Sequence, residues 1–286
     1  MLGSALGLLL VFRTNSSYDR FWEARKAQSS VVMACRNIAA HAYTHVPKIN
    51  HAALAAMLTA YVIIQKQHLQ GVTSIQELEP LKKYLSKSSH SDVQNILENI
   101  PKKRNRPLYV LRTLESFIHH SLMEKYRDPE QYLLTSPKYI EKHFIESLHC
   151  LSNSLAICER ILKQPVPLSY SRHTSRFLSL YLLALPFNLV SSLGWLTVPI
   201  ISAVCWSFVS VQEIGHFIEE PFDKETQVIP LNQIASVVRL DVSEILDGVI
   251  ESPELDSVEA VMFRETLNHS REKDESFFSY YMEPQK

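Results

Sequence analysis

Glycine is scarce in this sequence, which holds 6 glycines in 286 residues. Strand-rich folds use glycine in their tight turns, whereas the leucine and alanine that are abundant here favour helices. The sequence therefore predicts an all-α fold. An excess of charge is also lacking, since the net charge is -1. This balance excludes a general attraction for nucleic acid, so we expect no nucleic-acid partner.

Paired cysteines are absent. The four cysteines form no C-x-x-C motif, which argues against a disulfide framework and against a zinc knuckle. We expect four reduced, buried thiols, at Cys35, Cys150, Cys158 and Cys205.

Signatures of catalysis are missing as well. The chain has no glycine-rich phosphate loop, no G-x-S-x-G motif and no H-E-x-x-H motif, so we expect neither an enzyme nor a cofactor. His41 and His45, four residues apart on a predicted helix, could share a metal ion, although no third ligand is evident. A soluble helical metalloprotein is therefore one alternative, but we predict no metal site.

Charge is wholly absent from Phe177–Gln212, whose 36 residues include no Asp, Glu, Lys, Arg or His. As a helix this stretch measures roughly 54 Å, which is too long for one crossing of a hydrocarbon core of about 30 Å. It predicts two transmembrane helices, at about 177–192 and 195–212, joined near Asn188–Gly194. The alternative is a buried helical hairpin inside a soluble protein.

A second apolar run opens the chain and leads directly into charged residues, which predicts a membrane helix at about residues 1–20. Ser4, Leu8 and Phe12 share one face of this helix because they are four residues apart. In a symmetric ring of such helices they would form stacked collars, and a narrow apolar collar gates ions by dewetting. The simpler alternative is that this face packs against neighbouring helices.

Basic residues follow this run and also precede the uncharged stretch. The positive-inside rule assigns both groups to the cytosol-like side of a membrane, which agrees with a hairpin that returns to its starting side. After the first run, these residues are Arg13, Arg20, Arg25 and Lys26.

The remaining sequence, about 21–172 and 213–251, predicts a large helical extramembrane region. Its segment Ala52–Ile64 is apolar but too short to span a membrane, which indicates a buried helix. Apolar residues from Ile140 to Leu162 recur every three or four positions and predict one helical face. We expect that face to pack in a core or between subunits.

Two prolines flank Val166 and interrupt any helix at this point. A residue held between Pro165 and Pro167 has a restricted, extended backbone, so Val166 could form a rigid constriction. The alternative is an ordinary proline-rich connection.

Four motifs resemble the bestrophin family of anion channels. They are LLLVFRTNSSYDRFWEARK, CERILKQPVPLSYSRHTSRFL, LGWLTVP and EIGHFIEEPF, in the order in which that family has them. Two segments within them, His173–Arg176 (HTSR) and Ile218–Phe222 (IEEPF), are most similar to the plant and algal branch, the thylakoid voltage-dependent chloride channels. The resemblance covers about residues 1–231.

This resemblance implies a homopentamer in a lipid bilayer, in which each subunit gives helices to a central pore for chloride and similar anions, including bicarbonate. It implies a bestrophin-like channel domain at 1–251, whose helical part lies on the cytosolic or stromal side. The family's neck positions fall on Ser4, Leu8 and Phe12, and its second constriction falls on Val166. Ser4 departs from the bulky apolar residues usual in the neck, so we expect a wetter outermost collar.

Two further departures from the family pattern matter. The family has four membrane helices and the first has no counterpart here, so we expect an N-terminally truncated chain. The acidic calcium clasp of animal members is reduced to Asp223–Gln227, which holds too few carboxylates. We therefore expect control by voltage or pH and no calcium gating. Residues 252–286 are expected to form a polar C-terminal tail.

These observations together predict a passive chloride channel subunit in a plastid membrane, thylakoid or envelope, that balances the charge of proton movement. The rival is a membrane-anchored scaffold that oligomerises through the face at Ile140–Leu162 and conducts no ions.

Overall fold

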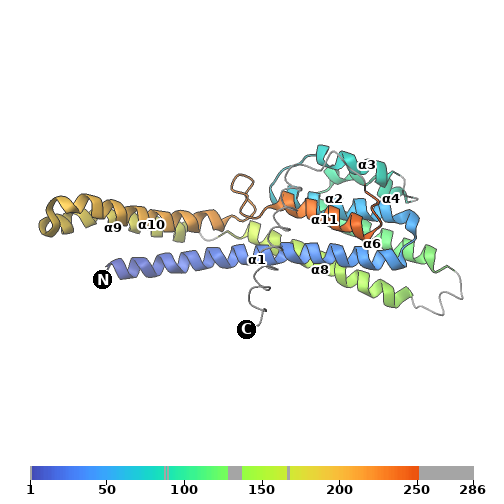
Figure 1. Cartoon of the computed structure of the whole chain (residues 1–286), viewed down its shortest axis with the longest axis horizontal. Coiled ribbons are helices and arrows are strands. Elements are labelled where there is room, and N and C mark those ends of the chain that lie inside the picture. The colour runs from blue at the N-terminus through green and yellow to red at the C-terminus, as the bar shows by residue number, and fades with distance from the viewer. Residues whose placement is uncertain (1, 87, 89, 128–136, 166–167, 251–286) are drawn as a thin grey trace, which may run out of the picture. The chain divides into compact units, whose positions relative to one another are not determined.

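The chain is described by a computed structural model (Figure 1), which covers residues 2–86, 88, 90–127, 137–165 and 168–250. Within these residues every regular element is a helix, as the composition predicts. The longer helices are α1 (Leu2–His45), α2 (His51–Leu69), α6 (Arg106–Lys125), α8 (Pro137–Lys163), α9 (Leu168–Leu193), α10 (Thr197–Glu219) and α11 (Leu231–Ile245). The shorter ones are η1 (Lys48–Asn50), η2 (Gln76–Leu78), α3 (Glu79–Leu85), α4 (Ser91–Gln94), α5 (Ile96–Asn99), η3 (Ile100–Lys102) and η4 (Gly194–Leu196).

The chain divides into two compact units. The hairpin unit holds Met1–Ser30 and Asn153–Ile229, and the helical-domain unit holds Val31–Ser152 and Pro230–Lys286. Helices α1 and α8 contribute residues to both units. The tail predicted at 252–286 lies outside the described residues.

Helix α2 is the buried centre of the helical-domain unit. Every residue from Ala53 to Gln65 is buried, and α3, α6 and α11 pack against it. The hydroxyl of Tyr61 donates to the carbonyl oxygen of Leu151 at 3.1 Å, which satisfies this phenol inside an apolar core. The buried helix predicted at Ala52–Ile64 is confirmed.

The apolar face predicted on α8 is used within the chain. Ile140, Phe144, Leu148 and Leu151 belong to the core of the helical-domain unit. Leu155 and Cys158 are also buried, whereas Leu162, at the end of α8, is 45% exposed. This face is thus largely covered, which leaves little of it for a scaffold to oligomerise through.

Helices α9 and α10 form an antiparallel hairpin (Figure 1). The chain reverses at η4, where Gly194 has φ +54°, a left-handed conformation that glycine adopts without strain. Among the described residues, one stretch is long and apolar enough to cross a membrane, Arg172–Glu219, and it contains the hairpin. Only 6% of its most apolar window is buried within the chain, which contradicts the alternative of a buried hairpin.

The membrane helix predicted at residues 1–20 is the start of α1, which continues without a break to His45. Among the described residues of this run, no stretch is both long enough and apolar enough to cross a membrane by length and composition, as the hairpin is. Forty-four residues make α1 about 66 Å long. One continuous helix therefore carries both the apolar run and the charged residues after it.

The prediction of four buried thiols holds for two of them. Cys35 and Cys158 are buried, while Cys150 and Cys205 are half-buried. Burial raises the pKa of both Cys35 and Cys158 to about 12, so these two thiols stay protonated at neutral pH. Cys205 is half-exposed because it lies on α10 of the mostly exposed hairpin.

Candidate functional site

The first turns of α1 separate two faces. Leu6 and Leu10 are buried in a small apolar cluster with residues of α9 and α10. Ser4 is exposed, and Leu8 and Phe12 are 57% and 58% exposed. The three residues predicted for the pore neck therefore share the face of α1 that this chain leaves uncovered.

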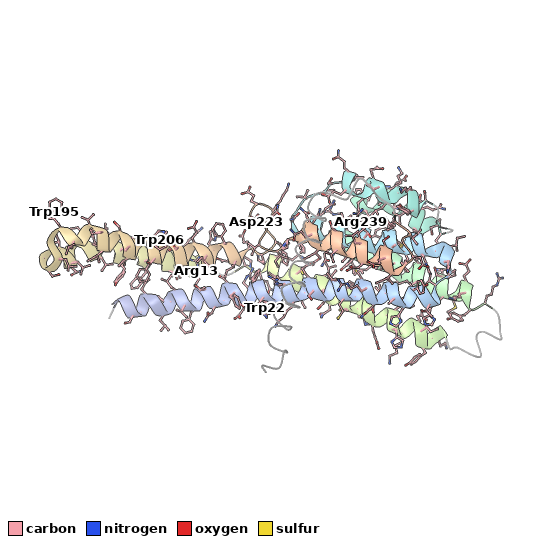
Figure 2. All side chains as sticks on the ribbon, viewed as in Figure 1. Arg13, Trp22, Trp195, Trp206, Asp223 and Arg239 are labelled. Carbon is pink, nitrogen blue, oxygen red and sulfur yellow. The ribbon has the colours of Figure 1, made fainter. Side chains whose placement is uncertain are left out.

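An aromatic row that the sequence reasoning missed continues along α1. The rings of Tyr18 and Trp22 stack, with centroids 6.4 Å apart and planes 7° from parallel. The Lys26 Nζ atom lies 5.6 Å from the centroid of the Trp22 ring, which is within the range of a cation–π interaction. The four-residue spacing of these residues is the signal that could have revealed the row. The row places the ammonium group of Lys26 beside exposed aromatic rings, on the same helix as the predicted neck (Trp22 is labelled in Figure 2).

Arg13 follows Phe12 but is buried, whereas Phe12 is exposed (Arg13 is labelled in Figure 2). Its Nη2 atom donates to Oε2 of Glu219 at 3.4 Å, and the two side chains are only 5% and 12% exposed. His216 Nδ1 lies 3.9 Å from the same carboxylate oxygen. This pair joins the end of α10 to the turn of α1 that carries the predicted neck.

Arg20 binds the C-terminal end of α8. Its Nη2 atom donates to the carbonyl oxygen of Ile161 at 2.8 Å, and its Nη1 atom donates to that of Gln164. The last carbonyls of a helix have no partner within the helix and carry partial negative charge, so a guanidinium suits them. The predicted constriction at Val166 follows directly in the sequence, lies outside the described residues and stays a prediction.

Two of the four basic residues assigned to the membrane border are not solvated charges. Arg13 is buried against Glu219, and Arg20 is bound to carbonyl oxygens. Arg25 and Lys26 are exposed. Each of the first two arginines has an acceptor on another helix, and the assignment of all four residues to the cytosol-like side stays a prediction.

The histidines considered as a metal pair have separate partners. His41 stacks on His143, with ring centroids 5.3 Å apart, and His45 Nδ1 lies 2.9 Å from the hydroxyl of Tyr126. Burial and the neighbouring charge of Lys125 lower the pKa of His45, and His41 and His143 add to this effect. In the part of the chain that the structure describes, no group of three or more His, Cys, Asp or Glu side chains could hold a metal.

The segment that replaces the calcium clasp forms a turn. Asp223 Oδ2 accepts a hydrogen bond from the backbone N–H of Thr226 at 3.0 Å (Asp223 in Figure 2). This bond and further N–H groups of the turn lower the pKa of Asp223. Its carboxylate therefore stabilises its own turn.

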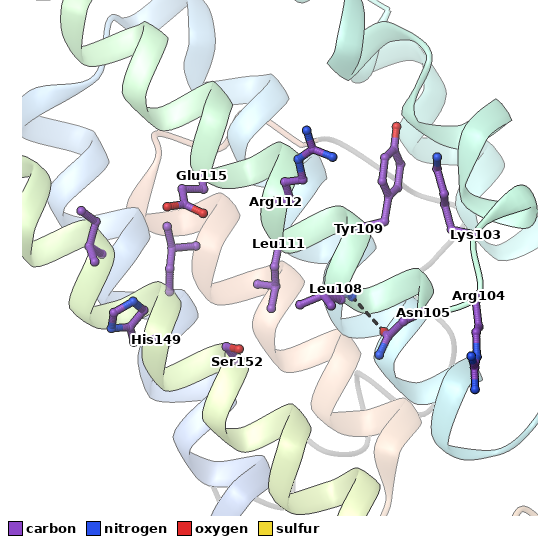
Figure 3. A pocket seen from close by; sticks show the side chains of 12 residues that line it. Lys103, Arg104, Asn105, Leu108, Tyr109, Leu111, Arg112, Glu115, His149 and Ser152 are labelled. Atoms are coloured by element: carbon purple, nitrogen blue, oxygen red, sulfur yellow. Dashed lines mark hydrogen bonds between the residues drawn. The ribbon is translucent and has the colours of Figure 1, made fainter.

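The helical-domain unit contains a cavity of about 520 Å³ between α6 and α8 (Figure 3). Lys103 and Arg104 line one end of it, and Leu111 and Leu148 are its buried apolar residues. Asn105 caps α6, because its side-chain oxygen accepts from the N–H of Leu108 at 3.2 Å. The cavity lies within the helical-domain unit, and none of the predicted neck residues lines it.

Comparison with known proteins gives a family match over most of the chain. The family model described as Bacterial/Fungal Bestrophin protein matches residues 1–244. The voltage-dependent anion channel-forming protein alr2987 of Nostoc sp. is 34% identical over 246 residues, which cover 84% of this chain and 74% of the relative. The chloroplastic voltage-dependent chloride channel 2 of Arabidopsis thaliana is 28% identical over 85% of this chain and 54% of its own length. The predicted plant and algal branch therefore stays a prediction.

A solved structure has the same fold. The crystal structure of a bacterial bestrophin homolog from Klebsiella pneumoniae matches with a TM-score of 0.73. The match covers 86% of this chain and 85% of that one, at 22% sequence identity. At this identity the likeness establishes the fold alone, and it agrees with the all-helical architecture.

Proposed function

The chain belongs to the bestrophin family, and on that premise we propose that it is a subunit of a passive, voltage-dependent chloride channel. Bicarbonate is the second ion that we propose it conducts, because an apolar neck selects anions by their ease of dehydration. Support comes from the relatives in Nostoc and Arabidopsis, which are named as anion and chloride channels. Neither name is that of an enzyme.

We propose a homopentamer in which five α1 helices surround the pore. The observation that carries this proposal is the exposure of Leu8 and Phe12, while Leu6 and Leu10 on the other side of α1 are buried. A row of large exposed apolar side chains is typical of a surface that packs against another element. Copies of the same helix around an axis would bury this row. Phe rings carry partial positive charge at their edges, which favours an anion over a cation.

The neck would consist of collars formed by Ser4, Leu8 and Phe12, with Val166 as a second constriction. The hydroxyl of Ser4 makes its collar more polar than the other two, so the narrow, dry part of the neck would be at Leu8 and Phe12.

The hairpin of α9 and α10 would cross the bilayer twice. Its exposed apolar residues support this, since Phe187, Trp195 and Trp206 are 78%, 93% and 74% exposed (the tryptophans are labelled in Figure 2). Lipid is the solvent that such side chains prefer. We propose a plastid membrane, with the thylakoid as the first choice. Support comes from two relatives in Arabidopsis that are named chloroplastic.

The test is anion flux through the purified protein in liposomes. The proposal expects chloride efflux that depends on the protein and on the imposed voltage, together with a native mass of five chains. A protein that inserts and oligomerises but gives no flux would be a scaffold. A protein that leaves membranes in aqueous buffer without detergent would contradict both functions.

A further inference from the structure

Three polar side chains lie one above another on the buried face of α1. Arg13, Ser17 and Arg20 are four and three residues apart, so they share a face of the helix. Arg13 is 4% exposed and Ser17 is 0% exposed. Among the described groups, four of their buried atoms have no hydrogen-bond partner. These atoms are Arg13 Nε, Arg13 Nη1, Ser17 Oγ and Arg20 Nε.

Buried polar atoms without partners are rare in folded proteins, because each has lost its bonds to water. Four of them within two turns of one helix indicate a shared, unseen ligand. The three guanidinium atoms can only donate, and a serine hydroxyl can donate too. A species that only accepts hydrogen bonds suits these donors, and one such species can accept from Arg13 Nε and from Ser17 Oγ, which lie one turn apart. A water molecule would bring two hydrogens that need acceptors of their own.

The charges around this face also favour an anion. Arg13 has Glu219 as its counterion, at 3.4 Å, which is longer than the usual separation of a charge-assisted bond. Arg20 donates to neutral carbonyl oxygens at the end of α8, and nearby Glu23 is already paired with Arg160. Among the described residues, Glu219 is the one carboxylate paired with either arginine. The charge of Arg20 faces the partial negative charge at the end of α8.

We propose that Arg13 and Ser17 bind a small monovalent anion inside the subunit, on the buried face of α1 and away from the exposed side chain of Phe12. The anion accepts from Nε of Arg13 and from the hydroxyl of Ser17, which leans toward Arg13 because helical side chains tilt toward the N-terminus. Arg20 adds positive charge one turn further on. The site holds α1 against the ends of α8 and α10. It lies outside the proposed conduction path and does not depend on it.

Ser17 offers a clean test, because neighbouring Ser16 is exposed on the same helix and serves as a matched control. The thermal midpoint of the full-length protein in detergent would be measured against chloride concentration, with gluconate keeping ionic strength constant. At chloride a hundredfold above its dissociation constant we expect the parent Tm to rise by about 5 °C or more. Ser17→Ala should raise the chloride concentration needed by about tenfold, and Ser16→Ala should not change it.

A second pair of variants isolates Arg13. Glu219→Gln removes the competing carboxylate and should lower the chloride concentration needed, whereas the double variant Arg13→Gln/Glu219→Gln should abolish the chloride effect without leaving a charge unpaired. A halide-independent Tm in the parent would overturn the proposal and indicate bound water. So would a double variant that responds to chloride as Glu219→Gln does. Since Tm is read without any current, a protein that binds chloride but gives no flux would contradict the channel and leave this site standing.

Discussion

A Cβ atom on Gly3 of α1 would lie 2.8 Å from the hydroxyl oxygen of Tyr181 on α9. Real Cβ atoms do not come so close to another heavy atom, so a side chain at residue 3 would push the hydroxyl end of Tyr181 aside. We expect Gly3→Ala to destabilise the hairpin unit by about 1 kcal/mol, because overpacking against Tyr181 exceeds the gain in helix propensity. Thermal unfolding in detergent checks this value.

Gly7 is the matched control for that substitution, because a Cβ atom there would meet nothing within 4 Å in the chain. Gly7→Ala should stabilise α1 by about 0.5–1 kcal/mol, since glycine is a poor helix former. Adding Tyr181→Phe to Gly3→Ala should restore most of the loss. If Gly3→Ala behaves like Gly7→Ala, then Tyr181 does not pack against residue 3.

Arg20 should contribute to stability through the end of α8. Arg20→Ala removes its bonds to Ile161 and Gln164 and leaves these carbonyls without that donor. Hydrogen bonds from a charged group contribute about 1.5–3 kcal/mol when buried, and since this side chain is half-buried we expect a loss of about 2 kcal/mol. Thermal unfolding of the variant gives the value.

Exposed Arg25 on the same helix is the control, and Arg25→Ala should change stability by less than about 0.5 kcal/mol. Equal effects of the two substitutions would mean that Arg20 acts only as a surface charge. The variant at Arg20 should also alter anion flux if the chain after α8 forms a constriction.

His45 should make the helical-domain unit less stable in acid. Its pKa in the folded chain is below the ordinary 6.5 because of burial, then Lys125. Between the two pKa values, the unfolded chain therefore binds a proton at His45 more readily than the folded chain does. The free energy of unfolding keeps its full value above about pH 6.5 and decreases as the pH falls toward the folded pKa. Hydrogen exchange of this unit between pH 7.5 and 5.5 would show the loss.

His45→Gln keeps a polar partner for Tyr126 but cannot take up a proton, so its stability should change less over this range. His149, an exposed residue of the same unit, is the control, and His149→Gln should follow the parent. A parent that grows more stable on acidification would reverse the assigned direction of the His45 shift.

Much of the fold could be predicted from patterns that are local in the sequence. The uncharged run Phe177–Gln212 predicts a hairpin, and the structure turns at Gly194, at the edge of the predicted junction. The period of three and four residues predicts the buried face of α8, with Leu162 as its exposed exception. The same period puts Ser4, Leu8 and Phe12 on one exposed face.

The buried arginines could not be predicted in this way. Arg13 and Glu219 are 206 residues apart in the sequence, and no periodic pattern reports a contact over that separation. A basic residue after an apolar run is typical of a membrane border. This general rule does not predict that Arg13 pairs with Glu219 or that Arg20 binds the end of α8. The unmatched donors around Ser17 become visible only once burial is known.

The most direct test of the account is the single-channel current of Leu8→Ala and Phe12→Ala in planar bilayers, beside the parent. Removing either side chain widens the dry part of the neck, so the account predicts a several-fold larger anion current with unchanged pentamer assembly. Leu183→Ala on α9, where Leu183 is 67% exposed, controls for the loss of an equally exposed leucine and should conduct as the parent does. If both neck variants assemble normally and carry the parent's current, then Leu8 and Phe12 do not line the pore.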